Sequence, residues 1–357
     1  MAGGAHEHDI TDITDLVEEL AASKASVLKI EETIALLEER QKKTAAAAAL
    51  LKERLDKLST TPPTTPPTTP PTTPPSTLKF AGDVKTGTIR WGAAINGNGD
   101  PIARHEAAAG TPLGVRRTFW DMSKTTSLLN TVKLDQLAGR VPWVSVKLGD
   151  TWENVAAGSK DAAFTKLFND LKATGKPVWF TAHHEPEGGN GTAFPDDGEG
   201  TEVHWRNMQK KIRTLLNATG ATNIAFAPIL MSWTWSTGSG RNPADWWVEN
   251  VWDFAGIDHY SDKETNTTMI TDTFKKCYDF YKAKGLRIAI GEWANRGTDA
   301  KAAAEMQEWY NYLISIGSPG VCYFDSGLNA PSGSWELAGE PLTKFRELMK
   351  APTSVRS

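Results

Sequence analysis

The stretch "PVWFTAHHEPEGGNG", residues 177–191, combines two very different halves. Its first half is apolar and typical of a buried strand. The run then ends on His183, His184 and Glu185, and a glycine-rich segment follows. Burial of an ionised carboxylate is costly unless the charge is paired or neutralised. Two interpretations are open: a strand end that emerges into solvent, or the edge of an active site.

Seven other apolar runs of similar length accompany this one along the chain. The eight candidate strands span residues 88–95, 114–120, 141–148, 177–184, 223–230, 254–260, 287–293 and 320–325. Helical patterns lie between most of them, and several end at glycine, as helix C-termini do. Eight β/α units within residues 78–350 predict an α/β fold, the (β/α)8 TIM barrel. A doubly wound open sheet is the alternative, but "NGNGD" (96–100) is typical of a turn and not of a phosphate-binding loop.

The N-terminal part of the chain has a different pattern. After a tail of residues 1–9, apolar residues recur at steps of three and four throughout residues 10–58. A heptad seam of this length predicts an α-helical coiled coil, with a single amphipathic helix packed on the next domain as the alternative. Polar Gln41 and Thr44 lie in the seam, where such residues can set the register. We expect self-association through this helix, as a trimer or, as the second choice, a dimer.

Four TTPP repeats fill most of residues 59–77. Because proline fixes φ and removes a hydrogen-bond donor, this segment is expected to be an extended polyproline linker. A short C-terminal tail, residues 351–357, follows the barrel region. A coiled coil followed by a linker and a globular domain favours an assembly in which one oligomeric stalk, the coiled coil, displays several copies of the globular domain.

Composition excludes several classes of function. The chain has 357 residues and a net charge of −4, so no basic field attracts nucleic acid or anionic lipid. No apolar run reaches membrane-spanning length and no signal peptide is visible, so we expect no membrane insertion. The two cysteines, Cys277 and Cys322, lie in segments expected to be buried, which indicates free thiols and not a disulfide framework.

In a TIM barrel the active site forms at the carboxyl ends of the strands. Glu185 and Glu292 each follow a strongly apolar strand, and their strands, the fourth and the seventh, lie on opposite sides of the expected barrel. Two facing carboxylates are what glycoside hydrolysis requires. One donates a proton to the leaving oxygen, and the other attacks the anomeric carbon or activates water.

Other strand-end residues are candidate substrate contacts, namely His184, Asp258, Tyr260, Trp233, Trp235 and Trp293. The tryptophans are equally compatible with sugar stacking and with packing. Arg116 and Arg117 face opposite sides of the second strand, so only one of them can reach the cleft. Glu187 would compete with Glu185 as the acid if the strand continued past Pro186. No cofactor is expected, and no metal site, because the adjacent His183 and His184 point to opposite faces of a strand.

The strand-end motifs resemble those of glycoside hydrolase family 26, the β-mannanase family of clan A. His184-Glu185 matches the His-Glu pair that carries the family's acid/base, and "IAIGEW" matches the Gly-Glu context of its nucleophile at Glu292. The segment "GIDHY" matches the family's sixth strand, with Tyr260 at the position that hydrogen-bonds the nucleophile. The resemblance covers residues 160–325 and implies a TIM-barrel O-glycosyl hydrolase that acts on a polysaccharide with retention.

The sequence departs from the family after the His-Glu pair. Family members continue with Met-Asn-Gly and a tryptophan-rich loop, whereas this chain continues with Pro186, Glu187 and glycines. The eighth strand ends in "YFDSG" without a tryptophan, although Trp335 follows. The resemblance therefore implies the type of reaction and leaves the sugar and the linkage open.

The stalked architecture resembles that of actinobacteriophage minor tail proteins. This resemblance implies a virion protein that is made in the host cytoplasm, contacts other tail proteins and cleaves a polysaccharide of the host envelope. The alternative is a structural or adhesive tail protein whose barrel binds polysaccharide without cutting it.

Overall fold

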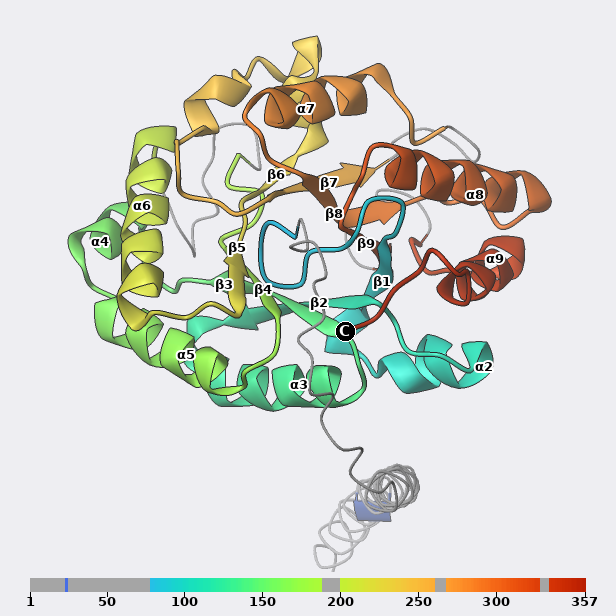
Figure 1. The fold of residues 1–357 in the computed structure, drawn as a ribbon, viewed down its shortest axis with the longest axis horizontal. Coiled ribbons are helices and arrows are strands. Elements are labelled where there is room, and N and C mark those ends of the chain that lie inside the picture. Colours follow the sequence, from blue (N-terminus) through green and yellow to red (C-terminus); the bar gives the residue numbers. More distant parts are fainter. Residues whose placement is uncertain (1–22, 25–77, 188–199, 261–267, 328–333) are drawn as a thin grey trace, which may run out of the picture. The chain divides into compact units, whose positions relative to one another are not determined.

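The computed structural model describes residues 23–24, 78–187, 200–260, 268–327 and 334–357. The predicted tail, coiled coil and proline-rich linker therefore lie outside the described residues, apart from the helical pair Ser23 and Lys24. Those three assignments stay predictions. In the described part of the barrel region, helices surround a central sheet (Figure 1).

All strand pairs in this sheet are parallel. The described ranges contain the strands β1 (Arg90–Ile95), β2 (Val115–Asp121), β3 (Val141–Lys147), β4 (Val178–Ala182), β5 (Ile224–Phe226), β6 (Ile229–Met231), β7 (Ala255–Tyr260), β8 (Ile288–Ala294) and β9 (Gly320–Asp325). Their order across the sheet is β5-β4-β3-β2-β1-β9-β8-β7-β6. Only Ala227 and Pro228 separate β5 from β6, so the two ends of this order are one interrupted barrel strand. The predicted TIM-barrel fold is confirmed, with its fifth strand divided at a proline that cannot donate to the ladder.

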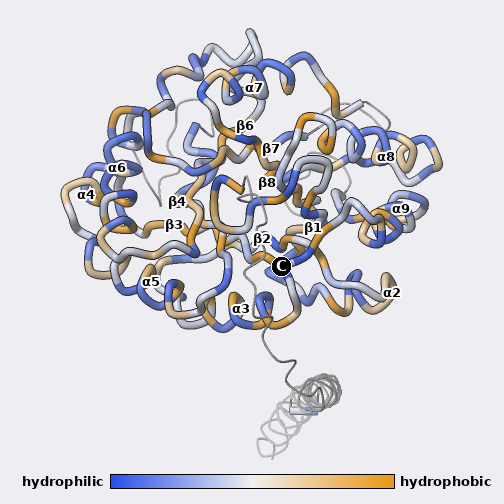
Figure 2. Tube along the Cα trace, in the orientation of Figure 1, coloured by the Kyte–Doolittle hydropathy of each residue, from blue (hydrophilic) through white to orange (hydrophobic). Residues whose placement is uncertain are grey.

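Helices cover the outside of the sheet (Figure 1). Those in the described ranges are α2 (Ala107–Ala109), α3 (Thr125–Leu137), α4 (Trp152–Ala157), α5 (Asp161–Ala173), α6 (Glu202–Thr219), α7 (Asp272–Ala283), α8 (Ala300–Ser315) and α9 (Gly339–Met349). Helix α6 shows why they pack there, since it buries Trp205, Met208, Ile212 and Leu216 at steps of three and four. The strands are largely hydrophobic, whereas hydrophobic and hydrophilic residues alternate along the helices (Figure 2). Among the described helices, none has the length and apolarity needed to cross a membrane.

Aromatic side chains close the end of the barrel at which the strands begin. Phe80 stacks on Phe254 with ring centroids 4.8 Å apart, and Trp179 lies 4.8 Å from Phe254. The indole of Trp179 also donates to the carbonyl of Ala81 at 3.0 Å. The residues expected as a C-terminal tail lie against the barrel as well, since the amide of Val355 donates to the carbonyl of Ile89 at 2.9 Å.

Both cysteines are free and fully buried, as the sequence predicted. Cys277 lies on α7 and Cys322 on β9. Burial raises the pKa of each thiol well above its usual value.

Candidate active site

Three carboxylates meet at the carboxyl ends of β4, β7 and β8. One side-chain oxygen from each of Glu185, Asp258 and Glu292 lies within 4.8 Å of the other two. Asp258 and Glu292 are buried. The structure thus brings together the two glutamates predicted from the sequence and places Asp258 beside them.

The backbone after β4 explains how Glu185 reaches this cluster. His183 and Glu185 have φ values of +50° and +51°, in the left-handed region that residues other than glycine rarely adopt. Their amides stay bonded to the neighbouring strands, His183 N–H to the Val146 carbonyl and Glu185 N–H to the Ile229 carbonyl. Each left-handed residue costs about 1–3 kcal/mol, and such residues concentrate at functional sites.

A register shift between β7 and β8 places the other two carboxylates. Ile257 pairs with Ile290, but the next residue, Asp258, pairs with Glu292, which leaves Gly291 unpaired in a bulge. A Cβ atom on Gly291 would lie 2.5 Å from both Arg117 Nη1 and Asp258 Oδ1. Glycine at this position therefore makes room for the arginine beneath the cluster.

Arg117, on β2, is the fully buried cation of the site. Its Nη1 lies 2.8 Å from Asp258 Oδ1 and 3.1 Å from Glu292 Oε1. Burial lowers the pKa of Arg117, but Asp258 and then Glu292 raise it further, so the pKa lies above its ordinary value and the guanidinium stays charged. Arg116 faces the other way and pairs with Asp135, so Arg117 is the arginine of β2 that reaches the cleft.

The surroundings of the cluster favour a protonated Glu185. Burial, with help from Glu292 and Glu187, raises the pKa of Glu185 to about 8, against the opposing effect of Arg117. Burial also raises the pKa of Asp258 well above its usual value, although Arg117 opposes this shift. One guanidinium cannot neutralise three carboxylates, so protons stay on the cluster near neutral pH.

Glu292 has two polar partners, one through an ion pair and one through a hydrogen bond. Arg117 contacts its Oε1, and the hydroxyl of Tyr260 donates to its Oε2, as the family resemblance implies. Burial, followed by the charge of Glu292, raises the pKa of Tyr260 well above its usual value, so the phenol keeps its proton. The ring of Tyr260 packs on Trp335 with centroids 5.1 Å apart.

The two histidines after β4 have separate surroundings. His183 accepts a hydrogen bond from the indole N–H of Trp152 at 3.2 Å, away from the cluster. The ring of His184 lies 5.4 Å from that of Phe119, and its Nδ1 is buried without a hydrogen-bond partner among the described residues. Burial, followed by the charge of Arg117, lowers the pKa of His184 well below its usual value, so the ring is neutral.

Glu187 lies outside the carboxylate cluster. Its Oε1 accepts hydrogen bonds from the Met231 amide at 2.7 Å and the Thr234 hydroxyl at 2.9 Å. These contacts tie it to the 3₁₀ helix η4 (Ser232–Trp235). The competing assignment of Glu187 as the acid therefore loses its geometric basis.

The three candidate tryptophans differ in exposure. Trp233 is 48% exposed, which suits a sugar platform. Trp235 is 8% exposed and packs on Phe280 and Tyr281 of α7. Trp293 is fully buried. Trp235 and Trp293 therefore present no exposed face for sugar stacking, because strand alternation turns Trp293 to the face opposite Glu292 and the 3₁₀ turn directs Trp235 back to α7.

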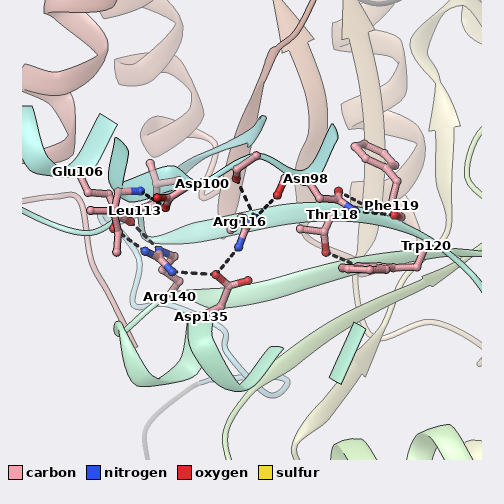
Figure 3. Close-up of polar contacts among 12 residues, drawn as sticks. Asn98, Asp100, Glu106, Leu113, Arg116, Thr118, Phe119, Trp120, Asp135 and Arg140 are labelled. Carbon is pink, nitrogen blue, oxygen red and sulfur yellow. Dashed lines mark hydrogen bonds and ion pairs between the residues drawn. The ribbon is translucent and has the colours of Figure 1, made fainter. Parts of the chain in front are cut away.

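A pair of hydrogen bonds at the end of β2, here called the polar clamp, was not predicted from the sequence (Figure 3). Asn98, in the 3₁₀ helix η1 (Asn96–Asn98), donates from Nδ2 to the Phe119 carbonyl at 2.8 Å and accepts from the Phe119 amide at 3.0 Å. Its φ of +56° is one that asparagine tolerates. These two hydrogen bonds extend the pairing of β1 with β2 past the end of β1. They hold Phe119, whose ring contacts that of His184.

A chain of buried ion pairs supports this clamp (Figure 3). Arg116 donates to the Asn98 carbonyl at 2.6 Å and lies 3.1 Å from Asp135. Asp135 also pairs with Arg140, which in turn pairs with Glu106. The sequence shows here only an asparagine-glycine turn followed by two arginines. Neither feature indicates that Arg116 contacts Asn98 and Asp135.

The carboxylate cluster has the oxygen ligands that a divalent cation prefers. Arg117, however, already contacts two of the three carboxylates from inside the barrel. The residues present therefore fit a cluster neutralised by a guanidinium and by protons better than a cation site.

Comparison with known proteins supports the fold and gives no family assignment by sequence. The sequence matches no protein-family model and no curated protein. The barrel is similar to the family 26 β-mannanase of Bacteroides ovatus, with 13% identity, a TM-score of 0.53, and coverage of 76% of this chain and 90% of that one. It is also similar to the catalytic domain of a family 26 endo-β-1,4-mannanase from Bacillus sp. JAMB-750, with 12% identity, a TM-score of 0.53, and coverage of 78% and 94%.

A third similar structure is the family 26 domain of an endo-β-mannanase/endo-β-glucanase from Prevotella bryantii. It is 12% identical, with a TM-score of 0.52 and coverage of 76% of this chain and 91% of that one. The described barrel has the fold of family 26 catalytic domains. Identities this low establish the fold alone.

Proposed function

We propose that the barrel is a retaining glycoside hydrolase that cleaves a polysaccharide. The observation that carries this proposal is the placement of Glu185 and Glu292, because one side-chain oxygen of each lies within 4.8 Å of the other. Retaining enzymes hold the two carboxyl groups about 5–5.5 Å apart, whereas inverting enzymes need about 6.5–9.5 Å to admit a water molecule. The short separation supports direct attack by one carboxylate.

The surroundings of each glutamate suit one role. The ion pair with Arg117 and the hydrogen bond from Tyr260 orient Glu292 as the nucleophile. Glu185, whose pKa is about 8, carries the proton that the leaving oxygen needs. This division of roles between two carboxyl groups follows from their different environments.

The reaction then has two steps. Glu292 attacks the anomeric carbon and forms a glycosyl ester, while Glu185 transfers its proton to the departing sugar oxygen. Glu185, now ionised, takes a proton from a water molecule that attacks the same carbon and releases Glu292. The ring of Phe119 contacts Arg117 and the ring of His184, and the exposed Trp233 offers a stacking surface for a neighbouring sugar.

The substrate and the setting of the enzyme are part of the same proposal. The similar structures are described as β-mannanases, which supports an endo-acting β-glycanase. The heptad pattern of residues 10–58 and the TTPP repeats support an oligomeric tail protein that presents the barrel to polysaccharide of a host envelope.

The test is a hydrolysis screen over β-mannans, β-glucans and bacterial envelope polysaccharides. The Glu292→Gln variant is expected to lose at least about 10³-fold in kcat, whereas the exposed Glu153→Gln control keeps full activity. The first product, followed by NMR, should retain the anomeric configuration. Inversion would overturn the two-step mechanism. A glycan that binds and stays intact with the unmodified protein would overturn hydrolysis in favour of an adhesin.

A further inference from the structure

The side chain of Glu187 attaches the segment that carries Glu185 to the interrupted fifth barrel strand. The amide of Glu185 donates to the carbonyl of Ile229 on β6 at 2.8 Å. Two residues further along each segment, Oε1 of Glu187 accepts a hydrogen bond from the amide of Met231 at 2.7 Å. A carboxyl oxygen thus takes the place of a backbone carbonyl, and the contact between the two segments continues past Glu185.

A second hydrogen bond extends this attachment to the segment after β6. Oε1 of Glu187 also accepts the hydroxyl of Thr234 at 2.9 Å, and the two residues are only 4% and 1% exposed. Thr234 lies in η4 next to the exposed Trp233. Met231 in turn pairs with Asp258 across β6 and β7. One buried oxygen therefore links the segment of Glu185 to two elements of the candidate site.

The backbone around Glu185 needs contacts of this kind. His183 and Glu185 both have left-handed φ values, of +50° and +51°. Such residues persist only where their surroundings hold them. Backbone hydrogen bonds hold the segment at His183 and at Glu185, and the carboxyl group of Glu187 holds it two residues further on. An acid must lie within about 2.6–3.2 Å of the oxygen that it protonates, so a small relaxation of this segment is enough to slow proton transfer.

We propose that Glu187 is a positioning residue that holds Glu185 where it can protonate the leaving sugar oxygen. This inference rests on the hydrolytic function proposed above and adds a residue to it. Glu187 lies in the stretch where the sequence departs from the family 26 pattern, so the family resemblance does not imply this role. Glu187 acts through Glu185 and does not itself contact the reacting atoms.

The protonation state of Glu187 allows a conservative variant. Burial raises the pKa of Glu187 to about 7, although its hydrogen bonds and the charge of Arg241 oppose this shift. At a pH of about 6 this carboxyl group is therefore largely neutral, and Glu185, whose pKa is about 8, is protonated. The Glu187→Gln variant then matches the shape and the charge, and its amide oxygen can accept both hydrogen bonds.

The test compares kcat/KM on two substrates at this pH. One is a manno-oligosaccharide, whose leaving group needs a proton, and the other is a dinitrophenyl β-mannoside, whose leaving group needs none; the same pair is built on another sugar if the hydrolysis screen identifies one. Glu187→Ala should lower kcat/KM roughly 10–100-fold on the oligosaccharide and less than about threefold on the dinitrophenyl glycoside. Glu187→Gln should stay within about threefold of the unmodified protein on both.

The matched control is Glu106→Ala. Glu106 is 8% exposed and also accepts a backbone amide, that of Leu113 at 2.8 Å, away from the carboxylate cluster. This variant should lower the melting temperature as Glu187→Ala does, but it should change kcat/KM on the two substrates by the same factor. Thr234→Val removes one of the two donors to Glu187 and should show the substrate difference at about threefold to tenfold. It decides the question if Glu187→Ala does not fold.

Several results would overturn the proposal. These are an equal loss on both substrates in Glu187→Ala and in Thr234→Val, no loss in either variant, or a Glu187→Gln variant as slow as Glu187→Ala. The Glu185→Gln variant distinguishes this failure from failure of the proposed function. If Glu185→Gln shows the substrate difference and the Glu187 and Thr234 variants do not, only the positioning role is refuted. If the unmodified protein hydrolyses no glycan of the screen, the hydrolytic function fails and the positioning role fails with it.

Discussion

Glu185 and Glu292 are chemically identical side chains in very different positions. Glu292 lies on a strand, forms an ion pair with Arg117 and accepts a hydrogen bond from Tyr260. Glu185 lies on a left-handed turn beside two other carboxylates, where burial favours its neutral form. At the scale of single residues, the protein thus gives two glutamates different partners within a few ångströms, and burial favours the proton on Glu185.

The first prediction concerns the alkaline limb of activity. The pKa of Glu185 is about 8, and the proposed reaction needs its protonated form. We therefore expect kcat/KM to fall as the pH rises through about 8, with no loss from this group below that value. The Glu185→Gln variant, assayed with an aryl glycoside whose leaving group needs no proton, should lack this limb. A limb that persists in the variant would assign it to another residue.

A second prediction concerns Gly291. A methyl group there would collide with the contact between Arg117 and Asp258, so Gly291→Ala should lower the free energy of unfolding by about 1–3 kcal/mol and reduce kcat. The matched control is Gly327→Ala, whose added carbon would meet Ser334 at an ordinary 3.5 Å. Thermal melts and initial rates of both variants test this prediction. Equal stability and equal kcat of the two variants would contradict the view that Gly291 makes room for Arg117.

At the scale of elements, the 3₁₀ helix η4 turns two nearby tryptophans to different surroundings. Trp233→Ala should lower kcat/KM on a polymer about threefold to tenfold with little change in stability, because the side chain is exposed. Trp235→Ala should instead lower the free energy of unfolding by about 3–5 kcal/mol, because it empties part of the contact with α7. Denaturant titration and kinetics separate the two effects. A Trp233 variant that is as unstable as the Trp235 variant would contradict this division.

The strands were predictable from sequence because each is a continuous apolar run bounded by polar residues, the pattern of a sheet buried on both faces. The meeting of Glu185 with Glu292 was predictable because the order of strands in a barrel fixes which strand ends face each other. The burial of Trp293 was not predictable in this way, because a shift of one position along β8 moves a side chain to the other face of the sheet. The clamp of Asn98 on Phe119 joins segments whose partnership no local pattern encodes.

At the scale of the whole chain, residues 10–58 remain a predicted coiled coil. Ile34→Lys places a charge in the predicted seam and should raise the dissociation constant of the oligomer about tenfold or more. Ala35→Lys, one residue further and outside the seam, should leave it unchanged. Sedimentation of both variants measures this effect, while activity per barrel on a small substrate should stay constant. Unchanged association of the seam variant would favour a helix packed on the barrel.

The two buried thiols bear on where such a protein can work. Oxidants attack the thiolate form of an accessible cysteine. Cys277 and Cys322 offer neither accessibility nor a low pKa, and among the described residues the barrel holds no disulfide that a reductant could open. In the folded barrel these two thiols should therefore stay unmodified in reducing and in oxidising solution alike.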